Sequence, residues 1–309
     1  MSYYMVKISI KKKYIFLGDC DSINIEIICK SFSLLKNKVK YIIIGNKDDL
    51  QKYQKKIKNN LKINTIIDPY DFDKVDSNLL NIFNVDHISK KKSENLLNQI
   101  KIANLISRNT RIDLITMAID KSIFKKETAF IGMTEYFAEI NKEKTIMLLY
   151  GDNFSVIPLT THINVKDVHF YIESKKLKSN LAFLLKIIKE KQYTLNFKTI
   201  KFLCYNPHCG ENRTIGDEDY IIKKTLKLFK NIKGPFSADS SFYKFKKNTL
   251  FISTYHDQVL IPFKALNKKM INITLGLKYR RLSPAHGIAK DIKFKNKANI
   301  ISFIECMKI

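Results

Sequence analysis

Three of the six histidines in the chain follow apolar segments that have the composition of β-strands. "FSVIPLTTH" ends in His162, "IKFLCYNPH" ends in His208 and "TLFISTYH" ends in His256. Taken singly, each is more often a hydrogen-bonded structural histidine than a ligand. Open α/β sheets, however, place their sites outside the carboxyl ends of strands, where all three imidazoles would lie. Three neutral imidazoles leave positions open on a divalent metal ion, so the pattern predicts a catalytic rather than a structural metal site.

Groups that bind anions follow the third histidine. Lys264 comes eight residues after His256, and "MINITLGLKYRRLSPAHG" adds Asn272 and Arg281. Arginine offers a planar fork for a carboxylate or phosphate, and lysine offers a point charge. Each alone could be a solvated surface residue, but beside a metal they predict an acidic, phosphorylated small substrate. Asp257 has two open interpretations, a carboxylate that orients a metal ligand or a surface carboxylate.

The elements that must position these residues alternate along the chain. Strand-like runs such as "KYIIIGN" and "TIMLLYGD" are separated by amphipathic stretches such as "SNLAFLLKIIKEKQ". "DEDYIIKKTLKLFKNIKG" begins with acidic residues and stops at Gly234-Pro235, as a helix does. Strands that alternate with helices predict an α/β fold with a largely parallel sheet. A chain of 309 residues is long enough for two domains.

The composition excludes several classes of protein. The formal charge is +26, but lysine is spread through every segment and arginine is scarce, which argues against specific nucleic-acid binding. No apolar run approaches the roughly 18 residues of a membrane span. The N-terminus lacks the layout of a signal peptide, and the five cysteines form no C-x-x-C pair. We therefore expect a cytoplasmic protein with reduced cysteines and no membrane partner.

Five segments in order resemble one enzyme family. They are "LTTHINVKDV", "YNPHCGENRTIG", "GPFSADSSF", "TYHDQVLIPFK" and "NITLGLKYRRLSPAHGIAKD". Their order and spacing are similar to those of 4-hydroxythreonine-4-phosphate dehydrogenases of pyridoxal phosphate biosynthesis. "GMTEYFAE" and "LITMAIDK" look like two further blocks of the family. The resemblance covers nearly the whole chain and is strongest in its second half.

The resemblance implies an isocitrate-dehydrogenase-like fold of two domains, with a largely parallel central sheet and an active-site cleft between the domains. The first domain would comprise residues 1–128 plus 283–309, and the second residues 129–282, which carry most of the metal and substrate residues. It also implies a homodimer whose metal ligands are shared between subunits.

The activity that the resemblance implies is the oxidation of 4-phosphooxy-L-threonine with NAD (or NADP). The oxidised product then loses carbon dioxide to give 3-amino-2-oxopropyl phosphate. One divalent ion per site, Zn, Mg or Co, would assist. By position, the resemblance places the metal ligands at His162, His208 and His256.

The remaining site residues are carried over in the same way. The predicted catalytic residues are Lys264, which would hold an anionic end of the substrate, and Asp257, which would orient a metal ligand. The predicted substrate contacts are Met133, Thr134, Lys264, Asn272 and Arg281. The predicted cofactor residues are Gly210, Glu211, Gly216 and Asp239, in the loops "GENRTIG" and "GPFSAD".

Some positions depart from the family. Met133 stands where the family usually has histidine, the N-terminal signature reads "GDCDSINIE", and Ala285 replaces a usual acidic residue. These changes leave two alternatives within the family, a dehydrogenase of another phosphorylated hydroxy acid and a degenerate homologue of low activity. A third alternative, motivated by the charge, is a polyanion-binding protein.

Overall fold

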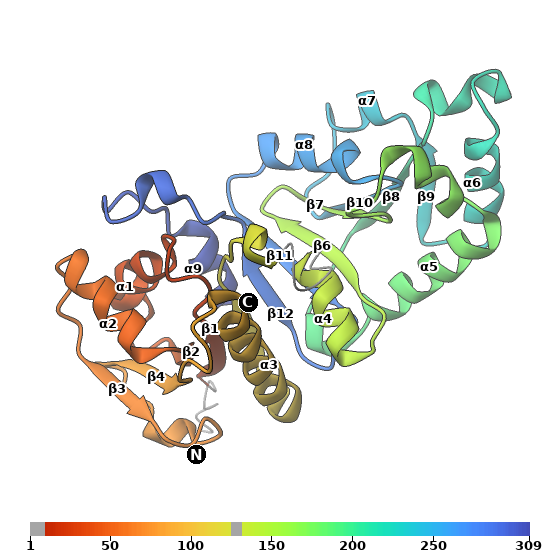
Figure 1. Ribbon diagram of the computed structural model, residues 1–309. Coiled ribbons are helices and arrows are strands. Elements are labelled where there is room, and N and C mark those ends of the chain that lie inside the picture. Colours follow the sequence, from red (N-terminus) through yellow and green to blue (C-terminus); the bar gives the residue numbers. More distant parts are fainter. Residues whose placement is uncertain (1–9, 125–131) are drawn as a thin grey trace, which may run out of the picture. The chain divides into compact units, whose positions relative to one another are not determined.

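The computed structural model describes residues 10–124 and 132–309, and the chain divides into two compact units (Figure 1). Unit 1 comprises Met1–Thr128 and Arg281–Ile309, and unit 2 comprises Ala129–Arg280. The first boundary expected from the sequence, between residues 128 and 129, lies outside the described residues. The second falls two residues earlier than expected, because Arg281 and Leu282 pair with Leu114 and Ile115 of unit 1. That the units are separate domains stays a prediction.

Unit 1 is built on parallel strands, and the strand order among its described residues is β3-β4-β2-β1-β5-β12. These strands are β1 (Lys11–Phe16), β2 (Val39–Gly45), β3 (Ile63–Ile66), β4 (Leu80–Asn84), β5 (Asp113–Thr116) and β12 (Arg281–Pro284). The helices are α1 (Asn24–Leu35), α2 (Lys47–Lys56), α3 (Lys92–Thr110) and α9 (Ile301–Lys308), with 3-10 turns at Phe72–Lys74, Lys121–Phe124 and Lys290–Ile292. The central strands are apolar because helices cover both faces of a parallel sheet.

Unit 2 has the strand order β11-β6-β7-β10-β8-β9 among its described residues. These strands are β6 (Ile146–Gly151), β7 (Phe154–Pro158), β8 (Thr199–Leu203), β9 (Ile232–Phe236), β10 (Thr249–Ser253) and β11 (Met270–Leu275). The pairs β11–β6 and β6–β7 are antiparallel, and the other pairs are parallel. The predicted largely parallel sheet is confirmed.

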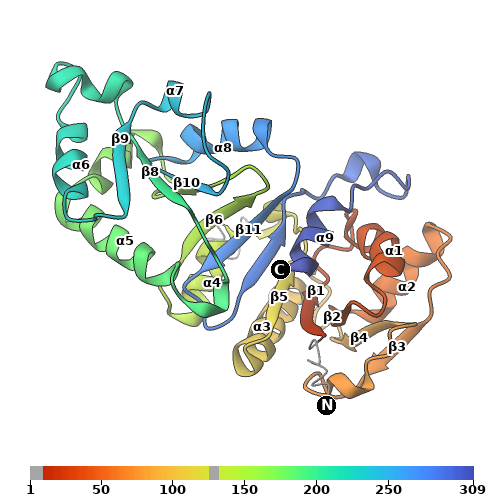
Figure 2. The ribbon, with the colours of Figure 1, turned by 180° about the vertical axis from the view of Figure 1, so that it is seen from behind.

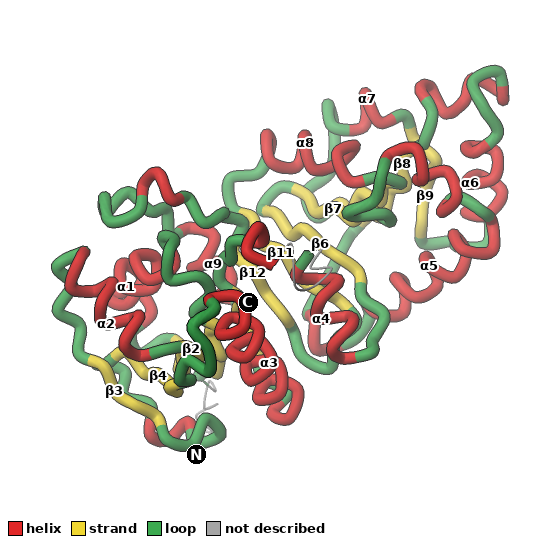
Figure 3. Tube along the Cα trace, viewed as in Figure 1, coloured by secondary structure: helices red, strands yellow, loops and turns green. Residues whose placement is uncertain are grey.

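The helices of unit 2 can be followed from both sides (Figures 2 and 3). They are α4 (Met133–Asn141), α5 (Ser174–Ile187), α6 (Glu218–Leu226), α7 (Ala238–Ser241) and α8 (His256–Leu266), with 3-10 segments at Val165–Tyr171, Lys191–Tyr193 and Pro207–Arg213. The helix α8 packs against β7 and β10.

An aromatic cluster joins β7, β10 and α8. The ring of Phe154 lies 4.8–5.9 Å from the rings of Phe242, Phe245, Phe251 and Phe263. Most of these pairs meet edge to face, an arrangement that stabilises by about 0.5–1.5 kcal/mol per pair beyond area burial. The cluster therefore fixes the positions of β7, β10 and α8 relative to one another. His162 follows β7, and His256 begins α8.

Over the described ranges, 10–124 and 132–309, we find no helix with both the length and the apolar character needed to cross a membrane.

Candidate metal centre

Two of the three predicted metal ligands lie side by side in unit 2. His162 follows β7 and His256 begins α8 directly after β10, and these two strands are parallel neighbours. Hydrogen bonds continue past the strand ends, from Leu159 N to Ser253 O at 2.9 Å and from Thr160 N to Thr254 O at 3.2 Å. The centroids of the two imidazole rings are consequently 5.8 Å apart.

A carboxylate meets the Nδ1 atom of each imidazole. His162 Nδ1 lies 3.0 Å from Glu135 Oε1, and His256 Nδ1 lies 2.7 Å from Asp257 Oδ1. A carboxylate that accepts from Nδ1–H leaves the lone pair of a neutral imidazole on Nε2, which is the usual arrangement of a metal-binding histidine. Within the described ranges neither Nε2 atom has a hydrogen-bond partner. This donor pair fits a divalent metal ion.

Glu135 is a site residue that the sequence did not predict. Its Oε1 atom also accepts a 2.6 Å hydrogen bond from the Thr161 hydroxyl. Burial alone would raise the pKa of Glu135, but the hydrogen bonds from His162 and Thr161 outweigh it and lower the pKa to about 2. The carboxylate is therefore ionised at neutral pH. Its position beside Thr134 in "GMTEYFAE" was the signal that could have drawn attention to it.

Gly132 leaves room for the pair of Glu135 and His162. A Cβ atom at this position would clash with Glu135 Oε2 and would lie 2.8 Å from His162 Cε1. Gly132 is the N-cap of α4, so the helix begins directly against the imidazole. Any side chain here would displace either the carboxylate or the ring.

His208, the third predicted ligand, follows β8, which is the other neighbour of β10. All three histidines thus come after the carboxyl ends of three adjacent parallel strands. Residues His208–Asn212 have positive φ angles, and the loop before them is held by buried Asp219, whose carboxylate accepts from the Tyr205 and Asn206 amides at 2.8 Å each.

His208 lines a cavity of about 640 Å³ together with Asp239, Asp257 and Gln258. In the described part of the chain, however, no three His, Cys, Asp or Glu side chains form a group able to hold a metal ion. One chain alone therefore brings two of the three predicted ligands together and leaves His208 apart from them.

The predicted substrate residues of unit 2 lie on α4, α8 and β11. Met133 is partly exposed at the start of α4, while buried Thr134 places its Oγ1 atom 3.4 Å from Thr274 Oγ1 of β11. Lys264 is exposed on α8, two turns after His256. The Oδ1 atom of Asn272 is buried and has no hydrogen-bond partner in the described residues. An unmet buried acceptor is costly unless a ligand or water satisfies it.

Arg281 belongs to unit 1 and is only 2% exposed. Its Nε and Nη2 atoms donate to Thr116 Oγ1 at 2.9 and 2.6 Å, which ties β12 to β5. Its role as a substrate contact stays a prediction.

Of the four predicted cofactor residues, only one lines the cavity beside His208. Asp239 lines the cavity that also contains His208, whereas Gly210, Glu211 and Gly216 do not line it. Gly210 and Gly216 have φ angles of +76° and +126°, in the left-handed region that favours glycine. The Ser237 hydroxyl, the Ser240 amide and the nearby His208 lower the pKa of Asp239.

The amino-acid sequence is similar to that of known proteins over nearly its full length. Residues 37–309 match the family described as "Pyridoxal phosphate biosynthetic protein PdxA". The chain is 34% identical to a 4-hydroxythreonine-4-phosphate dehydrogenase of Sulfurihydrogenibium sp. (strain YO3AOP1), over 99% of this chain and 97% of the relative.

Solved structures share the fold. A 4-hydroxythreonine-4-phosphate dehydrogenase from Klebsiella pneumoniae superposes with a TM-score of 0.80 at 22% identity, covering 96% of this chain and 98% of the other. A terephthalate 1,2-cis-dihydrodioldehydrogenase from Burkholderia xenovorans LB400 has a TM-score of 0.60 at 16% identity, covering 96% of each chain. The predicted α/β fold is confirmed, and it is the fold of these solved dehydrogenases. On its family match and its nearly full-length identity, the chain belongs to the PdxA family of pyridoxal phosphate biosynthetic proteins.

Proposed function

We propose that the protein is an oxidoreductase of pyridoxal phosphate biosynthesis that oxidises 4-phosphooxy-L-threonine with NAD (or NADP). The oxidation removes a hydride, which NAD accepts, and the proton of the hydroxyl group; the resulting β-keto acid then loses carbon dioxide and takes up a proton at the α-carbon to give 3-amino-2-oxopropyl phosphate. The name shared by its relatives, 4-hydroxythreonine-4-phosphate dehydrogenase, supports this substrate. The single observation that carries the proposal is the pair of imidazoles, each with Nδ1 held by a carboxylate and Nε2 left for a metal ion.

His162 and His256 would hold one divalent ion, Zn, Mg or Co, and His208 would come from a second copy of the chain in a homodimer. The absence of a three-ligand group within the described part of one chain is compatible with this sharing. When bound, the ion supplies Lewis acidity that lowers the pKa of the substrate hydroxyl and stabilises negative charge on the carbonyl oxygen. The protein residues Glu135 and Asp257 fix the orientation of the two rings.

The substrate residues act by position and charge. Lys264 attracts an anionic end of the substrate. A hydrogen-bond donor of the substrate satisfies the buried carboxamide oxygen of Asn272. Thr134 and Arg281 complete the proposed contacts. Holding the substrate in one orientation aligns its reacting hydrogen with the nicotinamide and so lowers the entropic part of the barrier.

We place the cofactor against the loops that carry Gly210, Glu211, Gly216 and Asp239. The cavity of about 640 Å³ beside His208 and Asp239 supports this placement, because its volume suits part of a dinucleotide. The proposal includes a cytoplasmic location, which the five free cysteines support.

The test is an assay of the purified protein with 4-phosphooxy-threonine, NAD and a divalent metal, followed as NADH formation. Replacing His208 with alanine should remove nearly all turnover and lower the metal content while the fold survives. His169→Ala is the matched control, because His169 is an exposed histidine of unit 2 outside the proposed set. A His208→Ala protein with the wild-type rate and metal content would show that the three-histidine assignment is wrong.

A further inference from the structure

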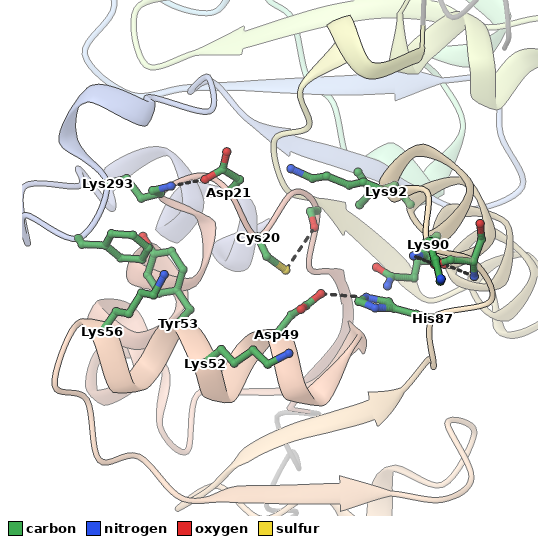
Figure 4. Close-up of a pocket in the computed structure, with 16 residues that line it drawn as sticks. Cys20, Asp21, Asp49, Lys52, Tyr53, Lys56, His87, Lys90, Lys92 and Lys293 are labelled. Atoms are coloured by element: carbon green, nitrogen blue, oxygen red, sulfur yellow. Dashed lines mark hydrogen bonds and ion pairs between the residues drawn. The ribbon is translucent and has the colours of Figure 1, made fainter. Parts of the chain in front are cut away.

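Unit 1 contains a cavity of about 650 Å³ that the proposed metal centre does not use (Figure 4). All of its lining residues belong to unit 1, whereas the proposed metal ligands belong to unit 2. Small-molecule sites in proteins typically measure about 300–1,000 Å³. The cavity is therefore large enough for a metabolite.

The cavity lies outside the carboxyl ends of three adjacent parallel strands. Gly18, Cys20 and Asp21 follow β1, the helix α2 follows β2, and His87 to Lys92 follow β4. These strands are neighbours in the order β4-β2-β1. Open parallel sheets bind their ligands at this edge, where the loops of several strands converge.

The charges around the cavity do not cancel. Each carboxylate of the lining has a basic partner, Asp21 with Lys293 and Asp49 with His87, the latter pair 3.0 Å apart. Lys92 is paired at 2.5 Å with Asp19, which is buried behind it. Figure 4 shows the first two of these contacts as dashed lines.

Three lysines of the lining, Lys52, Lys56 and Lys90, form no ion pair among the described residues; of these, Lys56 lies over the Phe294 ring, 5.0 Å from its centroid. Lys52 on α2 and Lys90 before α3 have no ion-pair or hydrogen-bond partner among the described residues. Burial raises the pKa of the Cys20 thiol well above its ordinary value, so no thiolate offsets them. The cavity therefore carries an excess of positive charge contributed by two different elements.

The N-terminus of α3 adds to the same field. Lys92, Asn95 and Gln99 of this 19-residue helix line the cavity. Its N-cap residue, Lys91, makes no side-chain capping bond to the first turn. The helix dipole and the first-turn amides favour an anion at this end.

We propose that this cavity binds a phosphorylated small molecule, whose phosphate is held by Lys52, Lys90 and the N-terminus of α3. The phosphate belongs either to a nucleotide or to a sugar- or glycerol-type phosphate. Aspartates that are already paired leave no free carboxylate in the lining for a metal cation. The proposal does not depend on the activity of the metal centre.

Calorimetric titration of the intact protein with pyrophosphate at low ionic strength tests the proposal. We expect saturable binding, and we expect Lys52→Gln and Lys90→Gln each to weaken it at least fivefold. Lys55→Gln is the matched control, because Lys55 is exposed on the same helix as Lys52 but does not line the cavity. A change below twofold is expected there. Equal losses in all three variants, or no saturable binding, would overturn the proposal by showing diffuse surface attraction only.

Two further titrations identify the source of the phosphate. AMP binding that is tighter than glycerol 3-phosphate binding, and is weakened by Lys52→Gln, assigns the site to a nucleotide. The reverse order, with the same sensitivity, assigns it to a non-nucleotide phosphate. If Lys52→Gln affects neither ligand, the proposal fails.

Lys264→Ala separates this site from the metal centre. The substitution should leave pyrophosphate binding unchanged while it impairs oxidation of 4-phosphooxy-threonine. If it abolishes pyrophosphate binding instead, the phosphate was bound at the proposed substrate residues, and the inference fails while the proposed function stands.

Discussion

His162 and His256 each have a carboxylate at Nδ1, but the two carboxylates come from differently placed chain segments. The partner of His162 is Glu135, which lies 27 residues earlier on α4, whereas the partner of His256 is its own neighbour Asp257. The side chain of Glu135 is 32% exposed and that of Asp257 is 70% exposed. Water competes more for the second bond, so Glu135 should fix its imidazole more firmly than Asp257 does.

Glu135→Gln should therefore weaken metal binding by about 10- to 100-fold, the usual effect of losing a carboxylate partner of a ligating histidine. Asp257→Asn should weaken it less. Chelator competition with cobalt or zinc measures both changes without reference to turnover. Glu139→Gln, an exposed position on the same helix, is the control and should leave affinity unchanged. Equal affinities for wild type and Glu135→Gln would contradict the orienting role.

Met133 tests the identity of the substrate. A histidine at this position can donate a charge-assisted hydrogen bond to an anionic group, typically worth about 1.5–3 kcal/mol, and a thioether cannot donate. Met133→His should lower KM for 4-phosphooxy-threonine by about tenfold or more and leave the metal content unchanged. Met133→Leu should leave KM unchanged.

Steady-state kinetics of these proteins decide between two substrates. An unchanged or higher KM for 4-phosphooxy-threonine in Met133→His would contradict the assignment of 4-phosphooxy-threonine as the substrate. If the same variant loses activity toward another phosphorylated hydroxy acid, methionine instead forms an apolar wall for that substrate.

At the scale of elements, the candidate centre depends on contacts that extend beyond the strands. The tips of β7 and β10 stay hydrogen-bonded through Leu159 and Thr160, and the loop after β8 is held by Asp219. Unit 1 has a comparable tie, in which Lys290 Nζ lies 2.7 Å from Asp120 Oδ2. Such ties between distant loops contribute to stability in a way that depends on pH.

Asp120 gives the pH prediction. The ion pair with Lys290, followed by the hydrogen bond from Ser122, lowers the pKa of Asp120 from 3.8 to about 2. Because the folded pKa lies below the unfolded one, the stabilisation is present above pH 3.8 and is lost as the pH falls through about 2. Asp120→Asn should lower the free energy of unfolding by about 1 kcal/mol at pH 7, after discounting for solvent screening.

Urea unfolding of wild type and Asp120→Asn at several pH values checks this. The difference between the two proteins should be constant from pH 7 to pH 5 and should shrink below pH 4. Asp291→Asn, at an exposed carboxylate nearby in the sequence, serves as the control. A difference that does not vary with pH would rule out the ion pair as its cause.

At the scale of the whole molecule, the excess of 26 positive charges is carried mainly by lysine distributed over both units. Even the interior of unit 1 contains a lysine, Lys13, which is paired with Asp113. A charge spread in this way attracts polyanions by releasing counterions but reads no sequence.

Binding to a short DNA duplex should accordingly be weak and independent of sequence. It should disappear between about 50 mM and 200 mM salt. Fluorescence anisotropy with two unrelated duplexes measures both properties. Tight binding at physiological salt that discriminates between the duplexes would instead support the polyanion-binding alternative.

The sequence alone determined the features that depend on local patterns. Apolar runs and amphipathic stretches predicted the α/β fold, and the motif order predicted the family, because both signals lie in contiguous residues. The three histidines were correctly expected after strand ends for the same reason. His256 and Asp257 could even be paired from the sequence, since adjacency brings them together.

Tertiary structure decided what depends on distant segments. Only packing brings Glu135 of α4 to His162, and only the pairing of β12 with β5 shows that Arg281 is buried against Thr116. Parallel neighbouring strands place three histidines on one edge, but among the described residues His208, in a loop of positive φ angles after β8, forms no three-ligand group with the other two. Such loop conformations depend on contacts like that of Asp219, which no local periodicity encodes.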